Sequence, residues 1–293
     1  MRIAVIFDQR RDDTWGIYFL RAFRQLGVEV RHAWLRDARQ LPATFDLYVR
    51  VDHGSYEQDM PPMHRPSVFI ISETHLVKPF RAICRQASRY TYCFCGHRDG
   101  ALRLKQRGIP AIWLAAACDP NLHHGPPQPL RYDVAYIGHE GGLARGIFLQ
   151  SLRERYPRNY LKTAPYQQMP DIYGAARLGV NWGYGDFPDR NTLNMRCFEI
   201  MAAGALCLTP VVQDGSVEAL GYRDREHLVL YRTPAEVPGL IDHYLNHEGE
   251  RARIAAAGMQ QTLAQHTYLH RVVALLAHVT GRPWAVPASS HVV

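Results

Sequence analysis

The sequence lacks the features of a membrane or secreted protein. Its 293 residues contain no apolar run of the roughly 20 residues that a membrane-spanning helix needs. The first residues, MRIAVIFDQRRDD, carry one basic residue and then a five-residue apolar run, too short for the core of a signal peptide. We therefore expect a cytoplasmic protein without a transmembrane segment, whose first apolar run is a buried strand.

Cysteine pairs with metal-ligand spacing are also absent. None of the six cysteines forms a C-x2-C pair, and Cys93 and Cys95 alternate within TYCFC, as core residues on one face of a strand do. Fifteen histidines are present, but His123 and His124 lie in a Pro-rich stretch and are interpreted as solvated. These patterns predict reduced, buried thiols and no metal site.

Charge of one sign is not concentrated anywhere in the chain. The net charge is +7, with a pI near 9.2, but no long Lys/Arg block occurs. The basic balance permits an anionic partner such as a phosphate, a nucleic acid or a membrane surface. It keeps duplex DNA among the candidate partners without selecting it.

What the sequence does have is a regular alternation of short apolar runs and helical patterns. Runs of this kind, bounded by Gly or Pro, are typical of parallel strands buried on both faces. Their repetition with helices predicts an α/β fold with doubly wound, Rossmann-like sheets. The predicted strands are Ile3–Phe7, Val28–Trp34, Leu47–Val51, Val68–Ser72, Thr91–Cys95, Ala111–Ala115, Tyr132–Ile137, Tyr160–Thr163, Leu178–Trp182, Leu206–Thr209 and Leu228–Tyr231.

A Pro-rich stretch, CDPNLHHGPPQPL, interrupts the alternation at residues 118–130 and predicts a linker. We therefore expect an N-terminal domain over residues 1–120, a linker over 121–131, a second domain over 132–280 and a loose tail over 281–293. Two doubly wound domains would face each other across a cleft lined by the carboxyl ends of their strands.

A glycine-rich turn follows the predicted strand Tyr132–Ile137. In YIGHEGGLARG, Gly138 and His139 leave the strand, and Arg145 lies at the start of the next helix. Free N–H groups and a nearby arginine suit a diphosphate. The pattern is neither G-x-G-x-x-G nor a P-loop, and glycines that only form a tight turn explain it equally well.

The stretch NTLNMRCFEIMAAGALCLTP places two opposite charges in an apolar helix over about residues 194–203. Arg196 and Glu199 are spaced to form a surface ion pair, which would contribute little. Alternatively they face a ligand: the helix start, with Asn194, and Arg196 favour phosphates, and Glu199 suits adjacent sugar hydroxyls. The position at the helix start favours the ligand, a nucleoside diphosphate.

The same stretch, with EHLVLYRTPAEVPGLIDHYLNHEGERARIAAAGMQQTLAQHTYLHRVVALL, resembles the C-terminal half of GT-B glycosyltransferases. The segments FCGHRDGALRLKQRGIPAIWLAAACDPNLH and YDVAYIG are similar to the spore-maturation (CgeB-like) branch. The resemblance implies two Rossmann-like domains, a nucleoside diphosphate sugar as co-substrate with the UDP type favoured, and no cofactor. It also implies metal independence. The residues agree with this, because the chain has no D-x-D pair in a strand–loop context and DFPD at 186–189 has the wrong spacing.

The resemblance also assigns roles on the donor side. In many retaining members two glutamates flank seven residues, the first contacting the sugar and the second the ribose. Glu199 matches the second, whereas Asn191 stands in place of the first. The resemblance further puts Gly138 beside the diphosphate, Tyr166 beside the base and Tyr231 on the donor side.

The N-terminal domain offers candidates for a general base at the ends of its predicted strands. An inverting transfer needs a base near the acceptor hydroxyl, and Asp, Glu or His serves. The candidates are Asp8, Asp52, His53, Glu73 and His75. Capping of the following helix by Glu73 or His75 is an equally good explanation, and the sequence does not rank the candidates.

The sequence thus predicts a glycosyltransferase that moves a sugar to a hydroxyl of a glycan, protein, metabolite or hydroxymethylated base in DNA. The alternative is a non-catalytic sensor of a nucleotide or nucleotide sugar, which the departure at Asn191 favours.

Overall fold

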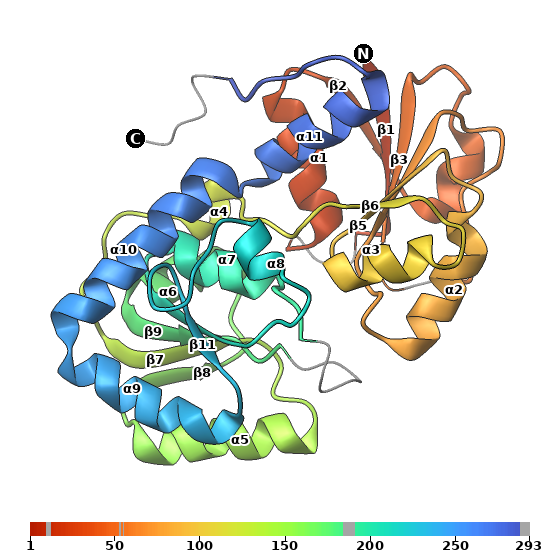
Figure 1. Ribbon diagram of the computed structural model, residues 1–293. Helices are drawn as coiled ribbons and strands as arrows, with labels where there is room; N and C mark the ends of the chain where they lie inside the picture. The colour runs from red at the N-terminus through yellow and green to blue at the C-terminus, as the bar shows by residue number, and fades with distance from the viewer. Residues whose placement is uncertain (10–12, 53, 55, 184–190, 288–293) are drawn as a thin grey trace. The chain divides into compact units, whose positions relative to one another are not determined.

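The computed structural model describes residues 1–293 except residues 10–12, 53, 55, 184–190 and 288–293. The described residues form two compact units (Figure 1). The first contains Met1–Ala116 together with the C-terminal segment from Tyr268, and the second contains residues 117–183 and 191–267.

The first unit is built on a parallel sheet with the strand order β2-β1-β3-β4-β5-β6. Its strands are β1 (Arg2–Ile6), β2 (Glu29–Ala33), β3 (Leu47–Val51), β4 (Ser67–Ile71), β5 (Tyr92–Cys95) and β6 (Ala111–Trp113). Its helices are α1 (Trp15–Gln25), the 3-10 helix η1 (Leu35–Gln40), α2 (Val77–Ala87), α3 (Arg98–Lys105) and α11 (Tyr268–Thr280).

The second unit has a parallel sheet of order β11-β10-β9-β7-β8. Its strands are β7 (Tyr132–Ile137), β8 (Asn159–Lys162), β9 (Ala176–Val180), β10 (Leu206–Pro210) and β11 (Val229–Tyr231). Its helices are α4 (Pro120–His123), α5 (Leu143–Arg155), η2 (Tyr166–Gln168), α6 (Met169–Gly174), α7 (Met195–Ala202), α8 (Ser216–Ala219), η3 (Pro234–Glu236), α9 (Val237–Asn246) and α10 (Glu248–Gln265).

The α/β prediction is confirmed, because each predicted apolar run forms a strand. β3 and β7 have the predicted bounds, Leu47–Val51 and Tyr132–Ile137. Every residue of β3, β4 and β10 is buried, as expected of strands covered on both faces. None of the helices that the structure describes combines the length and hydropathy of a membrane span.

The cysteines behave as core residues. All six are free thiols, and only Cys84 is not fully buried. Cys93 and Cys95 point into the apolar cluster that α2 and α3 form with β4 and β5. Burial raises the pKa of both thiols to about 12, so they stay protonated at neutral pH.

The division of the chain differs from the predicted one at its end. The prediction assigned residues 132–280 to the second domain, but α11 belongs to the first unit. Tyr268 packs against Trp15, Tyr18 and Phe19 of α1, with ring centroids 4.9 to 6.4 Å apart. Periodicity shows which face of a helix is apolar but not which domain covers that face, so the sequence alone did not reveal this return.

We predict that Tyr268→Ala destabilises the first unit by about 3–5 kcal/mol, the range for removing a buried aromatic side chain. Tyr268 is 2% exposed, and its ring is shared by three aromatic neighbours. Urea denaturation monitored by tryptophan fluorescence measures the effect. Gln25→Ala, at an exposed position of α1, is the matched control and should change stability by less than about 0.5 kcal/mol. Equal stability of the two variants would contradict the assignment of α11.

Candidate functional site

The second sheet reverses its strand order beside β7. This strand lies between β8 and β9. The chain therefore adds β8 on one side of β7 and then adds β9, β10 and β11 on the other side. Ligands of open α/β sheets bind outside the carboxyl ends of the strands at such a reversal. Because β7 ends at Ile137 and β9 at Val180, the expected position is between Gly138 and Asn181.

The side chain of Arg196 lies across this position. Its Nε donates to the carbonyl of Ile137 at 2.9 Å, and its Nη1 donates to Oδ1 of Asn181 at 3.4 Å. The guanidinium also lies 4.8 Å from the centre of the Tyr136 ring. Within the described part of the chain nothing accepts a hydrogen bond from Nη2. One permanent cation therefore joins the ends of two strands and keeps a donor for an anion.

Gly138 is needed for this arrangement. A methyl group on its Cα would lie 2.6 Å from Nη2 of Arg196 and 3.0 Å from the hydroxyl of Tyr136, too close for a normal contact. Its backbone is outside the left-handed region, so the turn itself does not require glycine. Of the two explanations for this glycine, the structure supports close approach by a functional group.

The first turn of α7 is held against the sheet by a chain of amides. Oδ1 of Asn194 caps the helix by accepting the N–H of Arg196 at 3.0 Å, and its Nδ2 donates to Oδ1 of Asn181 at 3.1 Å. Asn181 is fully buried and donates in turn to Thr209 at 3.0 Å. The positive end of the α7 dipole and the guanidinium therefore face the same carboxyl edge of the sheet.

Glu199 is buried one turn further along α7, 6% exposed, and faces His123 of α4. Its Oε1 lies 3.8 Å from Nε2 of the imidazole. The backbone N–H of Asp119 donates to Nδ1 of His123 at 3.0 Å, so in the neutral ring the proton is on Nε2 and points toward the carboxylate. The imidazole of His123 therefore lies beside the Glu199 carboxylate, with an N–H directed toward it.

The interpretation of His123 and His124 as solvated was wrong. His123 is 2% exposed, and Nδ1 of His124 lies 2.8 Å from the carbonyl of Ala202. The Pro-rich stretch predicted as a linker contains α4, which packs on α7. Four helical residues are too few to produce a detectable period, so this helix could not be predicted from the sequence.

The remaining candidates near β7 are less enclosed. His139 is exposed, and its carbonyl accepts hydrogen bonds from the Tyr136 hydroxyl at 3.2 Å and from Nη1 of Arg145 at 3.0 Å. Nε of Arg145 is buried and meets no acceptor among the described residues. Tyr166 is half-buried at the start of η2. These three side chains stay candidates for the diphosphate and the base.

Asn191 and Tyr231 differ from each other in accessibility. Asn191 donates through Nδ2 to the carbonyl of Val211, just after β10, and is half-buried. Tyr231, predicted on the donor side, is fully buried, and its hydroxyl donates to the carbonyl of Asn181 at 2.7 Å. The ring fills the core of the second unit, so Tyr231 supports Asn181 from behind and cannot itself contact a ligand.

In the first unit the order reverses between β1 and β3, and Asp52 follows β3. Its Oδ1 accepts the N–H of Gly54 at 3.0 Å. Its Oδ2 accepts from the Tyr56 hydroxyl at 2.8 Å and from the N–H groups of Ser72 and Glu73 at 3.1 and 3.2 Å. These four hydrogen bonds tie the ends of β3 and β4 together through the Asp52 carboxylate, and its predicted role as a base stays a prediction.

Glu73 and His75 meet at the end of β4, as their spacing predicted. Oε2 of Glu73 lies 3.8 Å from Nε2 of His75, and both side chains are partly accessible. Burial and the adjacent Asp52 carboxylate raise the pKa of Glu73 to about 7. A carboxyl group in this range exchanges its proton at neutral pH, which is the property that a general acid or base needs.

The imidazole of His97, which follows β5, is a third member of this group. It lies 5.0 Å from the ring of His75, and its Nδ1 is 3.1 Å from the Thr74 hydroxyl. Burial, together with the nearby His75, lowers the pKa of His97 to about 3, so this ring is neutral at pH 7. His97 was not among the predicted candidates, although its place directly after a strand, in FCGHRD, was the available signal.

The other predicted candidates for the base are Asp8 and His53. Oδ1 of Asp8, after β1, accepts the backbone N–H of Leu35 at 2.9 Å and so ties the start of η1. His53 and the DFPD stretch at 186–189 lie outside the described residues. Among the residues that the structure describes, no group of three His, Cys, Asp or Glu side chains is arranged to hold a metal ion, and metal independence stays a prediction.

The geometry defines a protein with two doubly wound α/β units and an arginine at the carboxyl edge where the second sheet reverses. Residues 130–277 match the family described as glycosyl transferase-like, which covers just over half of the chain. The chain therefore belongs to the glycosyl transferase-like family. The narrower resemblance to the spore-maturation branch stays a prediction. No curated protein sequence matches the chain.

Solved structures share the fold across nearly the whole chain. HepE of Anabaena, in complex with UDP and glucose, has a TM-score of 0.68 at 10% identity, over 96% of this chain and 100% of its own. Sucrose-phosphate synthase of Thermosynechococcus elongatus has a TM-score of 0.65 at 11% identity, over 96% and 98%. The DNA-modifying β-glucosyltransferase has a TM-score of 0.62 at 12% identity, over 96% and 100%. The predicted GT-B architecture is confirmed.

We predict a pH-dependent stability effect for Glu73→Gln. In the wild type the folded state keeps the Glu73 proton up to about pH 7, whereas the unfolded chain releases it near 4.5. The folded state then binds more protons, so this group's contribution to the free energy of unfolding falls as pH rises through that window. The Glu73→Gln variant has no titrating group at this position, so its free energy of unfolding does not fall for this reason.

Its stability relative to the wild type should therefore rise by about 1–2 kcal/mol between pH 4.5 and pH 8, allowing for screening at a partly exposed carboxyl. Urea denaturation at both pH values measures the difference. A difference that stays constant with pH would rule out a raised pKa for Glu73.

Proposed function

We propose that this glycosyltransferase uses a nucleoside diphosphate sugar of the UDP type, held by the second unit, and transfers the sugar to an acceptor hydroxyl. The observation that carries the proposal is the position of Arg196 across the carboxyl ends of β7 and β9. The solved structure of HepE with UDP-glucose supports the choice of donor, since that protein shares the fold.

In this proposal the diphosphate lies over Gly138 against the guanidinium of Arg196 and the first turn of α7. The neighbouring Tyr173 and Tyr136 phenols and the Glu199 carboxylate raise the pKa of Arg196 although burial lowers it, so the cation is permanent. Negative charge that develops on the departing diphosphate is stabilised by this cation and by the helix dipole. The two together supply the role that a divalent ion has in other transferases, which supports a metal-independent reaction without a cofactor.

Glu199 is proposed to accept the ribose hydroxyls. A buried carboxylate offers two oxygens to adjacent hydroxyls, and the imidazole of His123 lies 3.8 Å from one of them. Asn191, beside the carbonyl of Val211, is proposed to contact the sugar through its amide. An amide donates as well as accepts, so the sugar contact differs from one made by a carboxylate.

The first unit is proposed to bind the acceptor, with Glu73 as the general base. A pKa of about 7 leaves a large share of Glu73 ionised at neutral pH and able to take the proton of an attacking hydroxyl. His75, 3.8 Å away, is placed to receive or stabilise that proton. Glycans, proteins, metabolites and hydroxymethylated DNA bases are candidate acceptors.

Duplex DNA has two features in its favour, the net charge of +7 and the likeness in fold to the DNA-modifying β-glucosyltransferase. Binding through phosphates releases counterions, so it should weaken steeply as salt increases. An absence of DNA binding at low salt would eliminate this acceptor.

The reaction is tested by incubating the full-length protein with a panel of nucleoside diphosphate sugars and measuring release of the nucleoside diphosphate, with and without candidate acceptors. We expect turnover with one base type, together with a rise in melting temperature caused by the same nucleotide. Binding without release for any donor and acceptor would favour the alternative, a nucleotide-sugar sensor.

Two substitutions should affect the donor differently. Glu199→Ala should weaken binding of UDP and of uridine equally, by about 1–3 kcal/mol, the range for hydrogen bonds to a charged group. Arg196→Ala should weaken UDP more than uridine, because only UDP carries the diphosphate. Titration calorimetry measures both ligands.

The matched controls are Glu218→Ala and Arg232→Ala, two exposed side chains of the same unit, which should bind as the wild type does. Equal losses of UDP and uridine in Arg196→Ala would make this arginine structural. Unchanged affinity in a folded Glu199→Ala protein would remove the ribose contact.

A further inference from the structure

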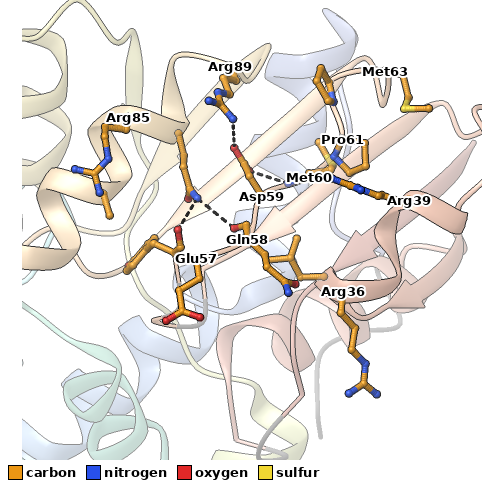
Figure 2. A pocket seen from close by; sticks show the side chains of 15 residues that line it. Arg36, Arg39, Glu57, Gln58, Asp59, Met60, Pro61, Met63, Arg85 and Arg89 are labelled. Carbon is orange, nitrogen blue, oxygen red and sulfur yellow. Dashed lines mark hydrogen bonds and ion pairs between the residues drawn. The ribbon is translucent and has the colours of Figure 1, made fainter.

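The first unit contains a concave site that the proposed function does not use. A pocket of about 990 Å³ lies between η1 and α2, over the segment that follows β3 (Figure 2). All of its lining residues lie between Leu35 and Arg89, within the first unit. Its size is in the range of sites for small molecules.

Four arginines surround the pocket, two from each side. Arg36 and Arg39 come from η1, and Arg85 and Arg89 from α2 and the turn after it. Figure 2 shows them around the segment from Glu57 to Met63. Arg36 lies 4.8 Å from the centre of the Trp34 ring and 3.7 Å from the exposed carboxylate of Asp37. In the described part of the chain Arg39 and Arg85 make no ion pair or side-chain hydrogen bond, so their charges are available to a ligand.

The carboxylate of Asp59, which also lines the pocket, is already neutralised by a buried arginine. Oδ1 of Asp59 accepts from Nη1 of the fully buried Arg50 at 2.6 Å, whereas Oδ2 of Asp59 lies 3.6 Å from Nη1 of Arg89. The same Arg50 nitrogen donates to Gln86 at 2.9 Å. Of the lining residues only Glu57 then offsets the four arginines, and the pocket has a net positive charge.

The floor of the pocket is rigidly held. Nε2 of Gln86 donates to the carbonyls of Tyr56 and Gln58 at 3.0 and 3.1 Å, and the N–H of Met60 donates to Asp59 at 2.8 Å. Met60 and Pro61 are buried and give the floor an apolar character. A preformed floor means that a ligand needs to order only the arginine side chains.

We propose that this pocket binds a small phosphate-bearing molecule. A phosphate group carries about −1.5 to −2 charges at pH 7 and three acceptor oxygens, enough to engage guanidinium groups from both η1 and α2. A single carboxylate has two oxygens and satisfies one such fork. The apolar floor contacts the rest of the molecule. A concave site of this kind encloses a small molecule, whereas a duplex presents its phosphates on a convex surface.

The test compares two double variants of the full-length protein with the same loss of charge. Arg39→Ala/Arg85→Ala removes the two available arginines, and Arg24→Ala/Arg81→Ala removes two exposed arginines of the same unit outside the pocket. Titration calorimetry measures binding of inorganic phosphate, a hexose phosphate, a short DNA duplex and UDP. All substituted side chains are exposed, and melting temperatures verify the fold.

We expect the pocket variant to bind phosphate and the hexose phosphate at least tenfold more weakly than both the wild type and the control variant, with the hexose phosphate the tighter ligand. Equal affinities in the two double variants would overturn the proposal. Loss of DNA binding alone in the pocket variant would also overturn it, in favour of a nucleic-acid surface. UDP affinity should be the same in all three proteins, and a failure of UDP to bind would count against the proposed donor and not against this pocket.

Discussion

The structure of the second unit depends on one cation placed where two strands of a parallel sheet diverge. Arg196 satisfies the carbonyl at the end of β7 and the amide after β9, and Gly138 makes room for it. A buried guanidinium is costly unless its hydrogen bonds and its charge are met. Most of that cost is offset by the hydrogen bonds of Arg196 to the Ile137 carbonyl and the Asn181 amide and by its contact with the Tyr136 ring. A bound diphosphate would supply the opposite charge.

The first unit uses buried polar groups in the same way but for a different purpose. Asp52 fastens the ends of β3 and β4 through four hydrogen bonds, and burial together with the Asp52 carboxylate raises the pKa of the neighbouring Glu73 to about 7. Arg50, completely buried, holds the loop that follows β3 through Asp59 and Gln86. Structural ionisable groups thus set both the protonation of a candidate base and the shape of the basic pocket.

Much of the fold could be predicted because strands buried on both faces leave a continuous apolar signal, as in LYVRV and YDVAYI. The Arg196–Glu199 spacing also pointed to a site, since a charge at a helix start beside a strand end has few structural uses. Short elements escaped prediction: α4 has four residues, and its histidine was taken for a solvated side chain. Tyr231 was misassigned because a strand-end aromatic is equally compatible with the core.

The sequence by itself determined two doubly wound sheets, the family resemblance and the residues at the strand ends, because each of these depends on local periodicity and spacing. Tertiary structure alone decided that His123 faces Glu199, that α11 returns to the first unit, and that Asp52 is saturated with donors. It also brought four arginines from η1 and α2 around one pocket. Such contacts join residues far apart in the chain, and no local pattern records which buried partner a polar side chain will meet.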